Sequence, residues 1–283
     1  MKIVSDNLLK KVIINRPSES HKGDYGRLLL IGGTYPYGGA IIMAALAAVG
    51  SGAGLVTVAT ERENISALHA HLPEAMAFDL REQERLMEQI RKASVILIGP
   101  GLAENPLEKS VLQLVLNLVD KRQILIMDGG AISLFAKQAL AFPSSQIIFT
   151  PQQKEWESLS GLPIESQDET SSQKAVDQFS EGTIVVQKGN RTRVFQSGVK
   201  DFYQLQVGGP YQATGGMGDT LAGMIAGFAG QFHQASLYER VVVATHLHSA
   251  IAQELAQEHY LVLPTEISKA IPKTMKTISQ RGN

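Results

Sequence analysis

Short apolar runs alternate with longer amphipathic or alanine-rich segments through the first half of the chain. A short run of β-branched and leucine residues between turn residues is typical of a buried strand, and the longer segments are typical of helices. Strands that alternate with helices predict right-handed βαβ units and a mostly parallel sheet covered on both faces. We expect strands at 27–31, 55–60, 94–98, 124–127 and 146–149, and helices at 40–50, 61–70, 107–119 and 131–140.

The rhythm changes after residue 180. Three short apolar segments, at 183–187, 192–196 and 202–206, are separated by glycine-bearing turns and predict an antiparallel meander at one edge of the sheet. Helices are expected again at 219–231, 237–259 and after Pro264, and the polar stretch 165–172 is expected to be a mobile loop. No linker or internal repeat interrupts the chain. We therefore predict one α/β domain over 1–283, a three-layer sandwich with a mostly parallel central sheet.

Composition narrows the class of protein. The 283 residues are 44% hydrophobic and 19% charged, as in ordinary globular proteins, and the net charge of −1 gives no support for a nucleic-acid or acidic-membrane partner. The absence of cysteine excludes disulfides, thiolate zinc sites and cysteine nucleophiles. No signal-peptide pattern and no membrane-spanning apolar run is found, so we expect a cytoplasmic protein without a membrane partner.

The strongest chemical signal is the stretch 213–220, Ala-Thr-Gly-Gly-Met-Gly-Asp-Thr, which runs directly into an apolar helix. Gly215, Gly216 and Gly218 let bare N–H groups approach a ligand, and the following helix N-terminus adds partial positive charge. Together they predict a cradle for phosphate. Asp219 inside this cradle is either a general base for a hydroxyl that attacks phosphorus or a plain helix N-cap, and we favour the base.

A second basic turn follows the strand expected at 183–187. Lys188 and Arg191 could neutralise phosphate charge while the N–H groups of Gly189 and Asn190 add donors, although Gly-Asn is also an ordinary hairpin turn. Glycine-bearing loops at 32–33, 99–101 and 128–130 each follow an expected strand, and Thr150–Pro151 follows another. Ligands of open α/β sheets bind at this edge, so these loops predict a cleft.

Three further features have both a functional and a structural interpretation. The loop 32–39 lacks the G-x-G-x-x-G spacing of a dinucleotide fold, and Glu61 is a weak candidate for a ribose contact, so a dinucleotide-binding dehydrogenase is disfavoured. This loop either receives a polar group of a substrate or is a structural glycine turn. Asp128 is interpreted as the cap of the helix behind it rather than as a magnesium ligand. His246 and His248 are two residues apart on a helix, which places them on different faces and argues against a shared metal.

The whole set of motifs resembles the ribokinase-like superfamily, and within it the ADP-dependent NAD(P)H-hydrate dehydratases. The resemblance covers nearly the whole chain, and its many motifs occur in the order of that family. It is carried by His21–Gly26, the 32–40 loop, Gly52–Val56, Pro73–Met76, Ile98–Leu102, Thr150–Pro151, Lys188–Thr192 and Ala213–Asp219.

The resemblance implies a nicotinamide-nucleotide repair enzyme, often a homotetramer. Such an enzyme converts hydrated NADH or NADPH (NADHX, NADPHX) to NAD(P)H, consumes ADP or possibly ATP with Mg²⁺, and releases AMP and phosphate. A separate NAD(P)H-hydrate epimerase would act beside it. By matching positions, Asp219 is the catalytic base. Substrate binding is implied for Ala40, Gly101, Gln152 and Asp219, and nucleotide binding for Lys188, Gly189, Asn190, Arg191, Thr192, Gly215, Gly216 and Gly218.

Two positions depart from the family pattern. Gln152 stands where the family usually has histidine, so it can hydrogen-bond a substrate but cannot change charge near neutral pH. Gly130 stands where the family tends to have an acid, and no metal ligand is assigned. Two other functions use the same residues: a ribokinase-like kinase for a hydroxymethyl or hydroxyethyl heterocycle, and a non-catalytic nucleotide sensor.

Overall fold

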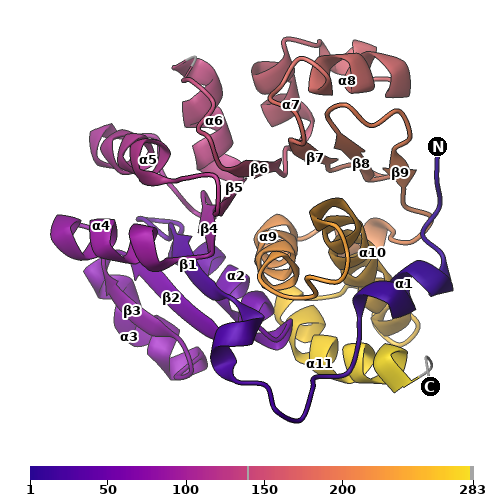
Figure 1. The fold of residues 1–283 in the computed structure, drawn as a ribbon, viewed down its shortest axis with the longest axis horizontal. Coiled ribbons are helices and arrows are strands. Elements are labelled where there is room, and N and C mark those ends of the chain that lie inside the picture. Colours follow the sequence, from indigo (N-terminus) through magenta and orange to yellow (C-terminus); the bar gives the residue numbers. More distant parts are fainter. Residues whose placement is uncertain (139, 281–283) are drawn as a thin grey trace.

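The computed structural model describes residues 1–138 and 140–280, and its strands form one nine-stranded sheet (Figure 1). The strands, all within those residues, are β1 (Arg27–Ile31), β2 (Leu55–Thr60), β3 (Met76–Asp79), β4 (Val95–Ile98), β5 (Ile124–Met127), β6 (Gln146–Phe149), β7 (Ile184–Gln187), β8 (Arg193–Gln196) and β9 (Tyr203–Gln204).

The strand order is β3-β2-β1-β4-β5-β6-β7-β8-β9. Pairing is parallel from β3 to β7 and antiparallel from β7 through β8 to β9. The predicted parallel sheet with an antiparallel edge is therefore confirmed.

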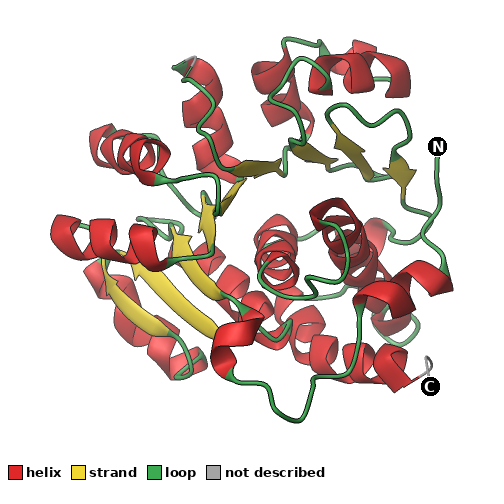
Figure 2. Cartoon of the chain, in the orientation of Figure 1, coloured by secondary structure: helices red, strands yellow, loops and turns green. Residues whose placement is uncertain are grey.

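Helices cover both faces of the sheet (Figure 2). They are α1 (Asp6–Val12), α2 (Gly38–Gly50), α3 (Arg62–His71), α4 (Gln83–Lys92), α5 (Pro106–Leu118), α6 (Gly129–Lys137), α7 (Gln153–Ser160), α8 (Glu169–Val176), α9 (Met217–Ala229), α10 (Leu237–Leu255) and α11 (Pro264–Gln280). The alternation of β1 divides the core, because Leu28 and Leu30 pack with α2, α9 and α10 while Leu29 and Ile31 pack with α4, α5 and α6. No helix in the described part of the chain is long and apolar enough to cross a bilayer.

Helices α2 and α9 lie side by side and run in the same direction. A Cβ on Gly223 would stand 2.1 Å from the carbonyl oxygen of Ala44, and one on Gly227 would stand 2.7 Å from Cβ of Ser51. Only glycine permits this close approach. Because the contacting residues lie at similar positions along the two helices, the first turns of both helices lie at the same edge of the sheet. That edge holds the carboxyl ends of the parallel strands.

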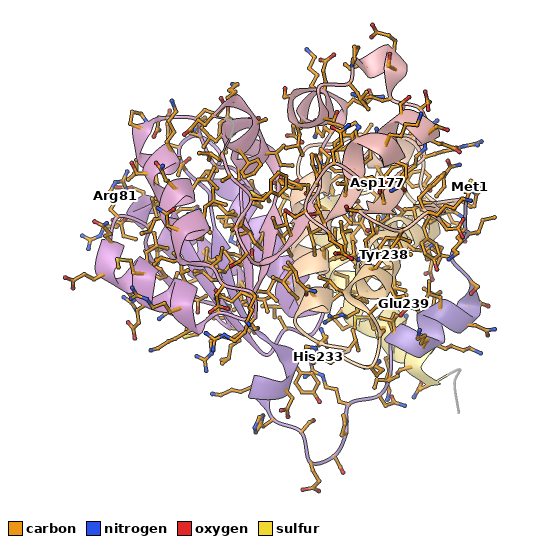
Figure 3. The ribbon with its side chains drawn as sticks, turned by 45° about the horizontal axis from the view of Figure 1, so that its top comes forward. Met1, Arg81, Asp177, His233, Tyr238 and Glu239 are labelled. Atoms are coloured by element: carbon orange, nitrogen blue, oxygen red, sulfur yellow. The ribbon has the colours of Figure 1, made fainter. Side chains whose placement is uncertain are left out.

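The C-terminal helices are tied to the antiparallel edge and to the N-terminal helix. Tyr238 on α10 donates its hydroxyl to the carbonyl oxygen of Val194 on β8 at 2.7 Å (Figure 3). The neighbouring Glu239, also labelled there, pairs with Lys11 of α1 at 2.6 Å. Because of these contacts, α10 has a fixed position beside the site described below.

Some elements differ from the expectation. Residues 165–172 are not a loop throughout: a 3₁₀ turn occupies Ile164–Ser166, and α8 begins at Glu169 because the Asp168 carboxylate accepts the N–H groups of Thr170 and Ser171. The helix expected at 219–231 begins at Met217, and the one expected at 237–259 ends at Leu255. The helix expected at 131–140 begins at Gly129, and residue 139 at its end lies outside the described residues.

Candidate functional site

A cavity of about 790 Å³ opens at the carboxyl edge of the sheet, between the first turn of α9 and the loops after β5, β6 and β7. Its carboxylates are Asp128, Glu155 and Asp219, and its cation is Lys188. The other residues predicted for the site that line it are Gln152, Gly189, Asn190, Thr192, Gly215, Gly216 and Gly218.

The glycine cradle is built at the start of α9. Gly216 has φ of +91° and is the N-cap of the helix, and a Cβ there would stand 2.3 Å from Sδ of Met43 on α2. The N–H groups of the first helical turn have no partner within the helix, so they face the cavity region as donors with partial positive charge. This arrangement is suited to bind phosphate.

Asp219 is not the N-cap of α9. The helix begins two residues before it, and its cap residue is Gly216, which has no side chain to contribute. The alternative interpretation of Asp219 as a plain cap is therefore wrong, because the glycine turn itself starts the helix. The carboxylate lines the cavity instead.

Asp128 and Lys188 form a buried ion pair in the floor of the cavity. Lys188 Nζ lies 2.8 Å from Asp128 Oδ1, and Thr150 donates its hydroxyl to the same oxygen at 2.5 Å. Asp128 is the N-cap residue of α6, as predicted, but its side chain makes no capping hydrogen bond, because Lys188 and Thr150 engage the carboxylate instead. Desolvation lowers the pKa of Lys188, but Asp128 and Glu155 outweigh it and leave that pKa raised.

Asp219 has the electrostatic environment of a general base. Its pKa is raised to about 6, with burial as the largest cause; the Asp128 charge acts in the same direction and the Lys188 charge opposes it. A base whose pKa lies near the working pH combines sufficient ionised population with useful basicity. Lys188 also lies over the cradle, since a Cβ on Gly218 would stand 3.1 Å from its Nζ.

Gln152 and Glu155 lie together at the start of α7. The Glu155 carboxylate accepts the backbone N–H of Gln152 at 2.7 Å, and burial raises the pKa of Glu155. The fold thus fixes the position of Gln152 at the cavity wall. Glu155 is a cavity carboxylate that the sequence reasoning missed, although it stands three residues after Gln152 in a capping-box pattern.

Three predicted residues lie outside the cavity lining. Arg191 is exposed on the turn between β7 and β8. Ala40 and Gly101 adjoin each other, because a Cβ on Gly101 would stand 2.9 Å from that of Ala40. Met43, one turn after Ala40, contacts Gly216, so this second wall borders the cradle.

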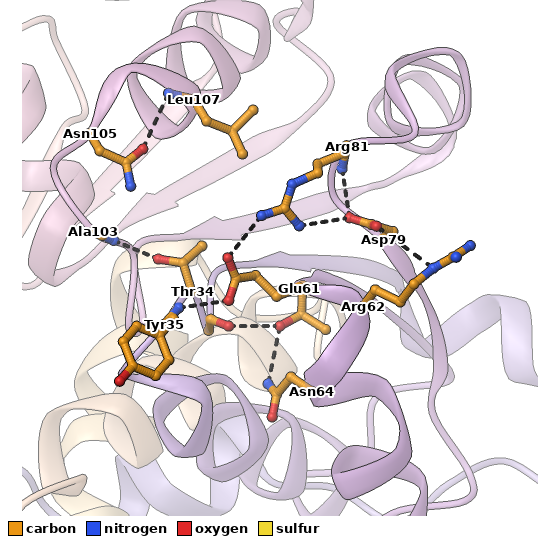
Figure 4. A network of polar contacts seen from close by, with 12 residues as sticks. Thr34, Tyr35, Glu61, Arg62, Asn64, Asp79, Arg81, Ala103, Asn105 and Leu107 are labelled. Atoms are coloured by element: carbon orange, nitrogen blue, oxygen red, sulfur yellow. Dashed lines mark hydrogen bonds and ion pairs between the residues drawn. The ribbon is translucent and has the colours of Figure 1, made fainter.

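The loop that leads into α2 is held by a polar network (Figure 4). Glu61 accepts the N–H of Tyr35 at 2.8 Å and pairs with Arg81 at 3.0 Å, and Arg81 also contacts Asp79. The hydroxyl of Thr34 accepts the N–H of Ala103 at 2.8 Å. Glu61 therefore supports the loop beside Ala40 through these contacts, whereas the sequence offered it only as a weak ribose ligand.

The sequence reasoning considered His248 only as half of a metal pair. The structure buries its ring to 4% exposure and places it in the cavity lining, where burial and the Lys188 charge lower its pKa to about 4. His246 is not among the lining residues. The two rings thus lie in different surroundings, as their spacing predicted.

No group of three or more histidine or acidic side chains in the described ranges is arranged to hold a metal ion. A magnesium ion that arrives on nucleotide phosphates needs only one or two protein carboxylates. Glu155 is available for that, since Asp128 is engaged by Lys188 and Asp219 is the candidate base. A second cavity of about 600 Å³, where α2 and α9 end, has no acidic side chain in its lining.

A mostly parallel sheet with glycine loops at its carboxyl edge, and an acid in the first turn of a glycine-capped helix, define a ribokinase-like α/β fold. The model of the NAD(P)H-hydrate dehydratase family matches residues 28–273. The chain belongs to this family.

Individual relatives agree with that assignment. The chain is 66% identical to the ADP-dependent (S)-NAD(P)H-hydrate dehydratase of Streptococcus pneumoniae, with 99% of this chain and 97% of the relative covered. A crystal structure of a hypothetical protein from Streptococcus mutans is 56% identical, with a TM-score of 0.95, and covers 98% of this chain and all of that one. The Bacillus subtilis ADP/ATP-dependent NAD(P)H-hydrate dehydratase, co-crystallised with ATP and Mg²⁺, is 27% identical with a TM-score of 0.83 over 98% of both chains.

Proposed function

We propose that this protein is an ADP-dependent (S)-NAD(P)H-hydrate dehydratase, a lyase that restores NADH and NADPH from their hydrates. The observation that carries the proposal is the position of Asp219, a carboxylate of raised pKa in the first turn of a phosphate cradle, beside a buried lysine. The names of the relatives that cover almost the whole chain supply the substrate class.

The nucleotide would bind with its phosphates in the cradle. The N–H groups of the α9 first turn donate to phosphate oxygens, and Lys188 over Gly218 offsets the charge that develops on the transferring group. Gly189 to Thr192 would contribute further donors from the turn after β7. ATP would fit the same groups, and the B. subtilis relative was crystallised with it.

Asp219 would start the reaction by taking the proton of the hydroxyl on the hydrated nicotinamide ring. The hydroxyl oxygen then forms a bond to the terminal phosphorus of ADP while the bond to the AMP oxygen breaks. This step converts hydroxide, a poor leaving group, into a phosphate ester. Gln152, Ala40 and Gly101 would position the ring.

The second step needs no further nucleotide. The lone pair of the ring nitrogen expels phosphate from the adjacent carbon, and loss of a proton from the neighbouring carbon restores the double bond. The products are NAD(P)H, AMP and free phosphate. Magnesium would supply charge neutralisation on the phosphates, with Glu155 as its available carboxylate.

Several finer features belong to the same proposal. We infer a cytoplasmic homotetramer that works beside a separate epimerase, which interconverts the two hydrate epimers. The relative from Coxiella burnetii is a bifunctional repair enzyme of which this chain spans about half, as expected if that enzyme carries a second activity in one chain.

A test by product analysis separates the proposal from its alternatives. NADHX, ADP and Mg²⁺ are incubated with the protein, and NADH, AMP and free phosphate are quantified by chromatography and ³¹P NMR. We expect equal amounts of all three. A stable phosphorylated organic product would indicate a ribokinase-like kinase, and binding of ADP without turnover would indicate a nucleotide sensor.

A further inference from the structure

Two tyrosine rings are exposed on the loop that leads into α2, and none of the steps above uses them. Tyr35 is 83% exposed and Tyr37 is 57% exposed. Among the residues that the structure describes, the only other exposed tyrosine, phenylalanine or tryptophan is Tyr260, on the connection between α10 and α11. Exposed apolar side chains that lie next to one another, unlike single scattered ones, mark binding surfaces.

The loop carries these rings on a fixed backbone. The backbone N–H of Tyr35 donates to the Glu61 carboxylate at 2.8 Å, and that of Tyr37 donates to the carbonyl oxygen of Thr34 at 2.6 Å. Thr34 is fixed in turn, since its N–H donates to the carbonyl oxygen of Gly101 at 2.8 Å. The ring of Tyr35 points away from this network (Figure 4). A ligand that stacks on the rings has little of the loop to order, which keeps the entropic cost of binding low.

Helix α2 sets the distance between this loop and the cradle. Tyr37, Ala40 and Met43 follow one another at intervals of three residues, so they lie on one side of the helix. Met43 contacts Gly216, and Tyr37 lies six residues before it, about 9 Å along the helix axis. A Cβ on Gly101 would stand 3.1 Å from that of Tyr37 and 2.9 Å from that of Ala40. The exposed rings therefore begin where the wall formed by Ala40 and Gly101 ends.

The cavity extends away from this wall. The residues that line it follow β5, β6, β7 and β9 or belong to α9 and α10, and neither α2 nor the loop 32–37 before it, both described throughout, contributes to the lining. In the sheet, β1, which leads into that loop, is separated from β7 by β4, β5 and β6. The wall thus lies on the β1 side of the first turn of α9, and the turn expected to bind nucleotide lies on its β7 side.

This division gives each reactant its own side of Asp219. A cavity of about 790 Å³ is of the size that encloses one small ligand, so it can hold ADP but not the dinucleotide substrate as well. For the reaction above, the hydrated ring must reach Asp219, and the rest of the substrate then extends along the first turn of α2. A Cβ on Gly39 would meet no atom within 4 Å, so there is room beside that turn.

We propose that the adenine ring of the NAD(P)H hydrate stacks on Tyr35 and Tyr37, and that these rings make the enzyme prefer the dinucleotide to the hydrate of reduced nicotinamide mononucleotide. This inference rests on the proposed function, which supplies the substrate. Adenine forms the far end of the substrate, and nucleic-acid bases stack on aromatic side chains without needing a particular hydrogen-bond pattern. Such stacking strengthens the binding of a base roughly fivefold to a hundredfold.

The experiment compares kcat/KM for NADHX with kcat/KM for the hydrate of reduced nicotinamide mononucleotide, at saturating ADP and Mg²⁺. The ratio of the two values does not depend on the fraction of active protein. We expect the wild type to prefer NADHX about tenfold, and Tyr35→Ala/Tyr37→Ala to lose most of that preference through a higher KM for NADHX. Tyr35→Phe/Tyr37→Phe keeps both rings and should keep the preference.

Tyr260 provides the matched control, because it is a fully exposed tyrosine on another loop. That loop reaches the cradle from a different side, since a Cβ on Gly216 would stand 3.2 Å from Cγ of Pro264. Tyr260→Ala should keep the wild-type ratio. If Tyr260→Ala loses the preference and the double alanine variant does not, the adenine lies on the α10–α11 connection and the assignment is overturned.

The remaining outcomes separate the two proposals. If the wild type converts both hydrates with equal kcat/KM, or if the double alanine variant keeps the wild-type ratio, the assignment of the tyrosines is overturned while the proposed function stands. The assignment is also overturned if KM rises equally for both hydrates, because the rings would then contact the nicotinamide half. If folded wild-type protein converts neither hydrate, the proposed function is wrong and this inference falls with it.

Discussion

Replacement of Asp219 by asparagine should abolish activity and at the same time stabilise the fold. The pKa of Asp219 in the folded protein is about 6, against a usual value of 3.8, with burial as the main cause. The fold therefore favours the protonated carboxyl, and the stability that this proton gives is complete below about pH 4 and is lost as the pH rises through about 6. The asparagine side chain of the variant is neutral at every pH and avoids that loss.

The size of the effect follows from the two pKa values. A difference of about 2 units corresponds to at most about 3 kcal/mol above pH 7 and to roughly half of that at pH 5. For a chain of this size, about 3 kcal/mol raises the melting temperature by roughly 6 to 12 °C.

The assay is thermal unfolding of the wild type and Asp219→Asn at pH 8, 6.5 and 5. Glu84→Gln, at an exposed position of α4, is the control for loss of a carboxylate charge and should leave the melting temperature nearly unchanged. The reasoning is refuted if Asp219→Asn is no more stable than the wild type at pH 8, or if its advantage does not narrow as the pH falls.

Two further predictions concern the reaction. The value of kcat/KM should fall roughly tenfold per pH unit below about pH 6, because Asp219 is protonated there. In Asp128→Asn this acidic fall should begin at a lower pH, because the Asp128 charge raises the pKa of Asp219. A pH–rate profile in which Asp128→Asn falls at the same pH as the wild type would contradict this. Gly218→Ala places a methyl group 3.1 Å from Lys188 Nζ. It should raise KM for ADP about tenfold, while KM for the hydrate changes little. Equal effects on both KM values in steady-state kinetics would show that the lysine does not bind the nucleotide.

The hydrophobic pattern predicted most of the fold because the parallel strands are buried on both faces and therefore read as continuous apolar runs. Strand β3 was missed because Met76–Asp79 is short and lies at the sheet edge, where only Phe78 is buried. Helix α8 was missed because its sequence is largely polar, and its start depends on the Asp168 cap rather than on an apolar stripe.

The site was predictable where backbone chemistry dictates residue type. The glycines of the cradle and Asp219 could be identified because close approach and positive φ favour glycine. The ion pair of Asp128 with Lys188 joins residues 60 positions apart, and nothing local in either segment indicates it. The burial of His248 likewise depends on how α10 packs behind α9, which periodicity does not specify.

The most direct test of the central claim is the absorbance of the dihydronicotinamide band in a mixture of purified protein, NADHX and Mg²⁺, with and without ADP. We predict that the band grows only when ADP is present, that AMP accumulates in step with it, and that Asp219→Asn slows the growth by orders of magnitude. If the band does not grow in folded wild-type protein with ADP or with ATP, or if it grows equally without any nucleotide, the account is contradicted.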